Sequence, residues 1–154
     1  MSKAQPTNWF ELDGIECGEA WIDGDETVRW RTNRLFDPGF PFSTGIETRS
    51  LSGVYVEVDP GDACETHTHD VEEVVLVHRG TLEFTVGDDV ATRTAGETSV
   101  VPPEVPHGFR NVGDGPAGVL GFMPTHEATT TFERVVEPIG ARAVGPDGPV
   151  VERP

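Results

Sequence analysis

Short runs of alternating apolar and polar residues recur along this chain of 154 residues. From Val54 to Val58 every second residue is valine, and from Leu82 to Val86 every second residue is again apolar. A period of two places successive side chains on opposite faces of a β-strand. Turn residues separate such runs about every 8–12 positions, a spacing typical of an all-β sandwich or barrel. The predicted strands cover residues 19–22, 28–32, 53–58, 73–78, 81–86, 90–94, 98–101, 108–112, 117–123 and 130–136.

No segment shows helical periodicity, and the 18 glycines and 13 prolines favour many short elements joined by turns. We therefore predict one all-β domain, a jelly-roll barrel. Arg79-Gly80 separates two of the predicted strands, so residues 73–78 and 81–86 are expected to form a hairpin.

The chain divides into three segments by composition. Residues 1–50 are expected to contribute N-terminal strands and loops, including two edge strands, and residues 51–137 are expected to form the barrel. Residues 138–154 are rich in proline and glycine and predict a mobile tail. With two cysteines, no leader-like segment and no apolar stretch of membrane-spanning length, the expectation is a soluble cytoplasmic protein.

The chain is strongly acidic, with 27 acidic residues, 11 basic residues and a formal charge of −16. Such a surface repels phosphate backbones and anionic membranes, which argues against nucleic acid and lipid headgroups as partners. Lys3 is the only lysine. Two interpretations stay open: arginine replaces lysine through genomic base composition, or the acidity is a halophilic adaptation to a salt-rich cytoplasm.

Three of the five histidines, together with one glutamate, form a pattern typical of a metal site. His67 and His69 lie two residues apart, so on a strand both imidazoles share one face. Glu73 begins the next apolar run, and His107 follows a proline-rich stretch. Imidazole and carboxylate together suit Fe, Mn, Ni, Cu or Zn rather than Ca or Mg. The four residues are therefore the predicted ligands of one divalent metal ion.

Several neighbouring residues compete for the same roles. Spacing favours Glu73 over Glu72, which strand parity places on the outer face. His78 and His126 are expected to be ordinary surface or core residues. Parity in a regular strand also places Cys64 away from His67, as a packed or surface thiol.

The site residues carry a resemblance to a known family. Gly61-x5-His67-x-His69-x3-Glu73-x6-Gly80 resembles the first motif of the cupin superfamily at every fixed position. Gly96-x5-Pro102-x4-His107-x3-Asn111 resembles the second motif. One position departs from the family pattern: Glu104 stands where the family usually has glycine, which puts the local loop geometry in doubt. The resemblance implies a double-stranded β-helix with a metal in the barrel, and a homodimer formed through N-terminal strands.

The predicted function is metal-dependent chemistry on a small organic molecule. Three nitrogens and one oxygen leave open positions on an octahedral ion, which a catalytic metal needs. We favour Fe2+ and an oxygenase. One alternative is a metal-dependent isomerase or lyase using Mn2+, Ni2+ or Zn2+ without redox change, and another is a ligand-binding module without turnover. Mn2+, Ni2+, Zn2+ and Cu2+ also stay open as the identity of the bound ion.

Phe109 shares a face with His107 and is the predicted pocket residue. Four further residues either line a substrate pocket or are ordinary barrel residues. They are Arg49, Tyr55, Arg110 and Phe122.

The halophilic interpretation predicts that salt stabilises the fold. Molar salt screens repulsion among the carboxylates, so the free energy of unfolding should be higher at molar than at millimolar salt. Urea unfolding at both concentrations measures the difference, and a protein that gains no stability from salt would contradict the interpretation.

Overall fold

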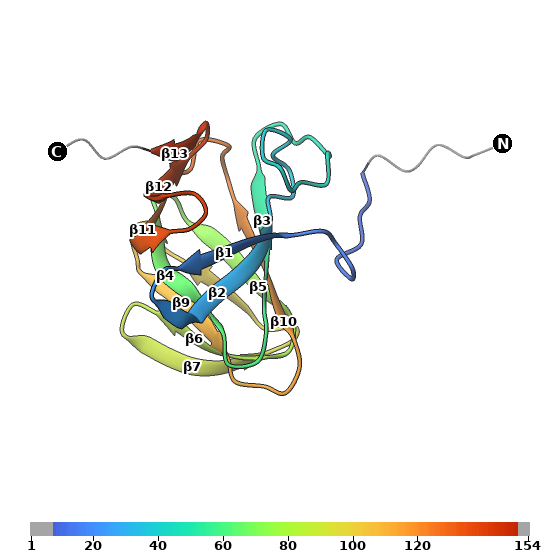
Figure 1. Cartoon of the computed structure of the whole chain (residues 1–154). Helices are drawn as coiled ribbons and strands as arrows, with labels where there is room; N and C mark the ends of the chain where they lie inside the picture. The colour runs from blue at the N-terminus through green and yellow to red at the C-terminus, as the bar shows by residue number, and fades with distance from the viewer. Residues whose placement is uncertain (1–7, 151–154) are drawn as a thin grey trace.

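A computed structural model describes residues 8–150, which form thirteen strands and no helix (Figure 1). Within these residues no helix is long and apolar enough to cross a membrane. The strands are β1 (Gly18–Ile22), β2 (Asp25–Asn33), β3 (Ser52–Val58), β4 (Ala63–His69), β5 (Glu73–Arg79), β6 (Thr81–Val86), β7 (Asp89–Thr94), β8 (Thr98–Val101), β9 (His107–Asn111), β10 (Ala117–Met123), β11 (Thr130–Val136), β12 (Ala141–Gly145) and β13 (Gly148–Val150).

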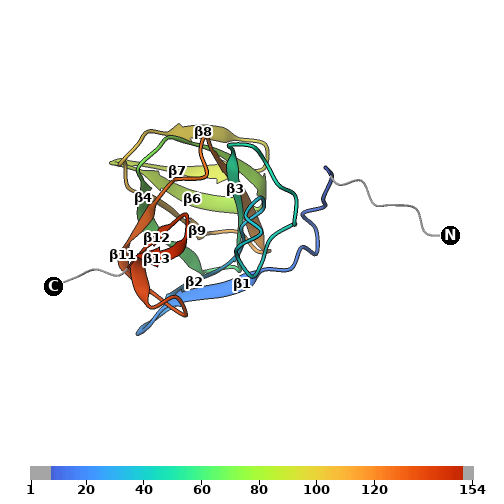
Figure 2. The ribbon, with the colours of Figure 1, turned by 90° about the horizontal axis from the view of Figure 1, so that it is seen from above.

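The strands form two antiparallel sheets that curl around one interior (Figure 2). The first sheet has the order β1-β2-β3-β10-β5-β8. The second has the order β13-β12-β11-β4-β9-β6-β7. A parallel pairing of Val28 in β2 with Ala63 in β4 joins the sheets along one side. The predicted all-β barrel is confirmed.

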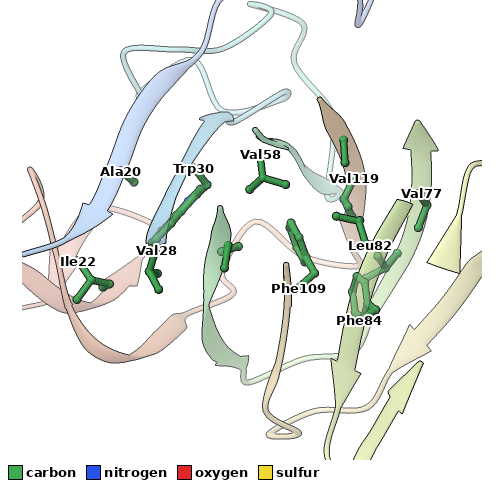
Figure 3. Close-up of a cluster of buried hydrophobic side chains, with 14 of the residues drawn as sticks. Ala20, Ile22, Val28, Trp30, Val58, Val77, Leu82, Phe84, Phe109 and Val119 are labelled. Atoms are coloured by element: carbon green, nitrogen blue, oxygen red, sulfur yellow. The ribbon is translucent and has the colours of Figure 1, made fainter. Parts of the chain in front are cut away.

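The period of two in the sequence corresponds to the inward face of each strand. Val77 and Val119 project from the first sheet toward Leu82, Phe84 and Phe109 of the second (Figure 3). The rings of Phe84 and Phe109 stack with their centroids 5.4 Å apart. All five side chains are buried and belong to a larger apolar core, and burial of such apolar area is the dominant favourable term in folding.

The predicted hairpin of β5 with β6 is wrong. β5 pairs with β10 and β8, whereas β6 pairs with β7 and β9. The chain crosses from one sheet to the other at Gly80, whose φ is 85° and which packs against Ala117 without space for a side chain. The same short connection thus serves as a corner between sheets, because each strand finds its buried partners elsewhere.

Both ends of the described chain differ from their predicted roles. β2 is not an edge strand, because it pairs with β1, β3 and β4. β12 and β13 form a hairpin on β11 where a tail was expected, and its turn includes Gly148 with a φ of 111°. Short apolar pieces next to a turn glycine are sufficient for this hairpin. Residues 151–154, the end of the predicted tail, lie outside the described residues, and the homodimer stays a prediction.

Glu104 adopts the backbone conformation that the family's glycine would supply. Its φ is 65°, in the left-handed region that L-residues rarely occupy. Its backbone N–H donates to the carbonyl of His69 at 2.7 Å, which attaches the loop before β9 to the end of β4. Glutamate in place of glycine at position 104 therefore adds backbone strain, while the loop keeps the left-handed turn that glycine would allow.

We expect Glu104→Gly to stabilise the protein by about 0.5–1 kcal/mol. Glycine removes the left-handed strain of roughly 1–2 kcal/mol, and the greater freedom of the unfolded chain offsets part of the gain. Chemical denaturation measures the change. Glu104→Ala is the control, since it removes the exposed carboxylate and keeps the strain; an equal gain in both variants would assign the effect to charge.

Candidate metal centre

The structure brings the four predicted ligands together inside the barrel. His67 and His69 lie near the end of β4, and His107 begins β9, the neighbouring strand, directly opposite His67. Glu73 begins β5 in the facing sheet. Its carboxylate therefore approaches the three imidazoles from across the interior.

The polar atoms of these residues lie within a few ångströms of one another. The three histidines offer ring nitrogens that are all within 4.8 Å of each other. Glu73 Oε1 lies 3.1 Å from His107 Nε2, and Glu73 Oε2 lies 3.3 Å from His69 Nε2. His69, Glu73 and His107 are at most 5% exposed, so the cluster is largely shielded from bulk water.

Each imidazole is oriented by a partner at Nδ1. The Nδ1–H groups of His67 and His107 donate to the carbonyls of Glu65 at 2.7 Å and Val105 at 3.0 Å. His69 Nδ1 lies 2.9 Å from Thr130 Oγ1. Because a carbonyl can only accept, Nδ1 carries the proton in His67 and His107, and in the neutral ring Nε2 keeps its lone pair. This anchoring is the usual arrangement around metal-binding histidines.

The same arrangement leaves lone pairs facing each other at the centre. With Nδ1 protonated, neutral His107 presents a lone pair to a carboxylate oxygen 3.1 Å away, and two acceptors at this distance repel. His69 Nε2 is buried and, among the described residues, has no hydrogen-bond partner. A cation between these atoms removes both penalties, and imidazole with carboxylate is a donor set that suits a first-row transition metal. The residues therefore fit the metal that the sequence predicts.

The local electrostatics favour the ionisation states that metal binding requires. Burial, followed by the neighbouring His107 and His69, lowers the pKa of His67 to about 3. Burial raises the pKa of Glu73, whereas His107 and His69, where their rings donate from Nε2 to the carboxylate, hold the pKa well below its ordinary range. A metal cation in the same place would act in the same direction. Near neutral pH, His67 is thus neutral and Glu73 is a carboxylate, the forms that ligate metals.

A glycine in β10 makes room for the carboxylate. A side chain at Gly121 would collide with Glu73 Oε2. β10 pairs with β5, with Gly121 opposite Val75. The absence of a side chain on this neighbouring strand allows Glu73 to turn inward toward the imidazoles.

The position of Cys64 differs from the prediction. Cys64 pairs with Phe109 and His67 pairs with His107, so Glu65 and Thr66 together lie opposite a single residue of β9. This β-bulge reverses the parity between Cys64 and His67 and turns both side chains inward. Cys64 is buried, and burial raises its thiol pKa well above the ordinary value. A neutral thiol is a poor nucleophile. Cys64 is therefore a packing residue that lines the cavity beside the histidines.

Glu72 and His78 lie where strand parity placed them, whereas His126, expected to be an ordinary surface or core residue, lines the cavity. Glu72 is exposed, and His78 points away from the cluster, with Nε2 3.7 Å from Asp13. His126 lines the same cavity as the cluster, and its Nε2 lies 2.9 Å from the carbonyl of Thr48. No periodic pattern marks His126, because it lies in a loop.

The cluster opens into a cavity of about 150 Å³. Phe109, the predicted pocket residue, lines this cavity. Of the residues that the structure describes, the wall does not include Arg49, Tyr55, Arg110 or Phe122. Sequence reasoning missed several residues that line the cavity. One signal could have found two of them, because Trp30 and Arg34 follow the alternation of β2 and share its inward face. The missed residues include Trp30, Arg34, Asp37, Phe40, Thr130 and Phe132.

Comparison with known proteins agrees with this architecture. Residues 54–122, which span β3 to β10, match the family model for the cupin domain. This segment is a cupin domain. It contains all four candidate ligands. H2HPP isomerase of Bacillus subtilis is 43% identical over 58 residues, which are 37% of this chain and 25% of that protein. The match therefore spans a quarter of the relative's length.

Solved structures share the cupin fold. A cupin 2 conserved barrel domain protein from Rhodopseudomonas palustris aligns with a TM-score of 0.54 and 24% identity, covering 70% of this chain and 71% of that one. Oxalate oxidase in complex with glycolate aligns with a TM-score of 0.57 and 24% identity, covering 68% and 55%. Oxalate decarboxylase of Lactobacillus farciminis aligns at 0.56 and 21%, covering 75% and 32%. At these identities the likeness shows the fold.

We expect the wild-type protein to bind one divalent metal ion. His67→Ala and His107→Ala should each lose most of this metal and have a lower melting temperature in its presence. Each removes one nitrogen ligand and leaves the remaining set incomplete. Elemental analysis after metal loading and dialysis measures the content. His78→Ala is the matched control, since this histidine faces away from the cluster.

Thr130→Val extends the test to the anchoring of His69. It removes the hydroxyl at Nδ1 while keeping every ligand. Partners of this kind change metal affinity by about 10- to 100-fold, so Thr130→Val should bind metal more weakly by that factor in a metal titration.

For the His67→Ala and His107→Ala variants, stoichiometric metal retained in both would refute the site.

Proposed function

We propose that His67, His69, Glu73 and His107 hold one Fe2+ ion and that the protein is an oxygenase acting on a small organic molecule. The observation that supports this most strongly is the convergence of three anchored imidazoles and one ionised carboxylate in a buried cavity. A bound divalent metal would supply Lewis acidity and open positions for substrate and dioxygen at adjacent sites.

The protein contributes orientation to this chemistry. The carbonyls of Glu65 and Val105 fix two rings, and the hydroxyl of Thr130 contacts the third. Ligands held in this way need no reorganisation when a substrate arrives.

The protein also limits the access of water. Val75, Phe84, Phe109, Val119 and Phe132 line the cavity around the cluster. Their apolar surface excludes water from the reacting groups and strengthens electrostatic interactions there. An oxygenase needs such a wall to keep reactive species from solvent.

A second candidate is a metal-dependent isomerase that works without redox change. The Bacillus subtilis H2HPP isomerase supports it through 43% identity over 58 residues. In this case Mn2+, Ni2+ or Zn2+ would polarise a carbonyl group of the substrate. The same four ligands would serve, so the two candidates differ in the metal and in the need for oxygen.

The oxygenase proposal predicts oxygen-dependent turnover with Fe2+. Iron-loaded protein mixed anaerobically with a panel of small organic acids, then with oxygen in a stopped-flow instrument, should show a change in metal absorbance and oxygen uptake. His107→Ala should show neither, because its metal site is incomplete. Purification without added metal provides an independent reading: native Zn2+ or Ni2+ without iron, and no oxygen-dependent change with any acid, would reject the oxygenase and favour the isomerase.

A further inference from the structure

Arg34 places a positive charge on the wall of the metal cavity. It follows the last residue of β2 and is half-buried, with its guanidinium carbon 4.4 Å from the centroid of the Phe40 ring. Both residues line the cavity that contains the histidine cluster. Burial lowers the pKa of Arg34, partly offset by Asp37, yet arginine stays charged at any physiological pH.

This guanidinium lacks an anionic partner. Among residues 8–150 no carboxylate lies within 4.0 Å of it, and its N–H groups make no hydrogen bond to another side chain or to the backbone. Partly desolvated charges are normally paired, since removing a cation from water costs free energy that a partner offsets. Arg34 therefore keeps unused donors at the cavity wall, where a ligand can bind them.

The backbone around Arg34 is fixed. Its N–H donates to the carbonyl of Phe42 at 2.8 Å, and its carbonyl accepts from the N–H of Asp37 at 3.0 Å. The N–H of Thr44 donates to Leu35 at 3.2 Å, which closes the loop on itself. A side chain on a closed loop loses less freedom when it binds a ligand.

An aromatic layer connects Arg34 with the histidines. The ring of Phe132 lies 5.1 Å from that of His67 and stacks on Trp30 at 5.5 Å. Trp30, Thr32 and Arg34 alternate along β2 and all line the cavity. At roughly 3.3 Å per residue, Arg34 lies about 13 Å along the strand from Trp30. The wall of the cavity thus combines a flat aromatic surface beside the histidines with a guanidinium farther along the same strand direction.

We infer that the cavity binds a small carboxylic acid with a flat apolar ring, and that Arg34 holds its carboxylate. The planar fork of the guanidinium matches a carboxylate in a bidentate pair. The aromatic layer suits a ring, and a cavity of about 150 Å³ is of a size known to admit benzene. A ring-bearing carboxylic acid is thus the substrate class inferred for the proposed function. The inference rests on that function only for the metal near the histidines, and binding of the carboxylate by Arg34 does not depend on it.

A carboxylate fits better than a phosphate. Asp37 lines the same cavity and contributes a negative charge near Arg34. Arg34 and Asp37 together carry no net charge, so every negative charge on a ligand is left in excess. A carboxylate leaves one such charge, whereas a phosphate monoester leaves nearly two at neutral pH.

Calorimetric titration of the full chain tests the inference with three acids: benzoate, phenylacetate and 3-phenylpropanoate. Benzamide and phenyl phosphate are the matched uncharged and doubly charged probes. We expect at least one acid to bind the Zn2+-loaded wild-type protein more tightly than either probe. Arg34→Gln should weaken it about 10- to 100-fold, as expected for a lost charged hydrogen-bond pair. Arg34→Lys should retain part of the affinity, and Arg93→Gln, at an exposed residue paired with Glu97, should match wild type.

Three results would overturn the inference: no binding of any of the three acids, equal affinity in wild type and a folded Arg34→Gln variant, or tighter binding of phenyl phosphate or benzamide. Melting curves of the ligand-free variant establish its folding. The same titrations with metal-free protein separate this inference from the proposed function. Arg34-dependent binding that persists there, together with no oxygen uptake by the iron-loaded protein, would reject the oxygenase and keep the carboxylate site.

Discussion

The contact of Glu73 with the imidazoles across the barrel is the interaction on which the rest of the site depends. A buried carboxylate is tolerated only where cations or donors surround it. The ring nitrogens of His69 and His107 lie 3.3 and 3.1 Å from Glu73, and a metal ion held by all three residues would supply the positive charge. The two sheets must approach closely enough for this contact, which Gly121 permits. Because the anchored ring of His107 presents a lone pair to Glu73, the contact is complete only with a cation between them.

A single inserted residue in β4 aligns the imidazoles with that carboxylate. The bulge between Cys64 and His67 sets the inward direction of the strand end. Glu65, within the bulge, performs two tasks: its carbonyl accepts from His67, and its side chain pairs with Arg134 at 2.7 and 2.9 Å. The backbone and the side chain of Glu65 both hold the β-bulge in place. The hydrogen bond from the His67 ring to the Glu65 carbonyl then fixes the orientation of that ring.

The sequence predicted what local periodicity and spacing determine. Alternation located the strands, and the intervals between His67, His69, Glu73 and His107 identified a cluster that the fold does bring together. The predicted pairing of β5 with β6 was wrong because the partners of a strand are set by contacts between residues distant in sequence. The turn residues between β5 and β6 are compatible with a hairpin and with a corner between sheets. Cys64 was misplaced because parity assumes a regular strand, and one extra residue reverses it.

Cavity-lining residues outside the motifs were harder to predict, because loops carry no period and the net charge hides local detail. A formal charge of −16 describes a surface that repels anions, yet Arg34 places a positive charge on the wall of the cavity, near Asp37. Exposed charges are screened over about 8 Å at physiological salt, whereas partly buried ones are screened much less. We therefore expect an anionic ligand inside the cavity to respond to Arg34 and the metal ligands more than to the acidic exterior. The net charge argues against polyanionic partners, and this argument does not extend to a small acid.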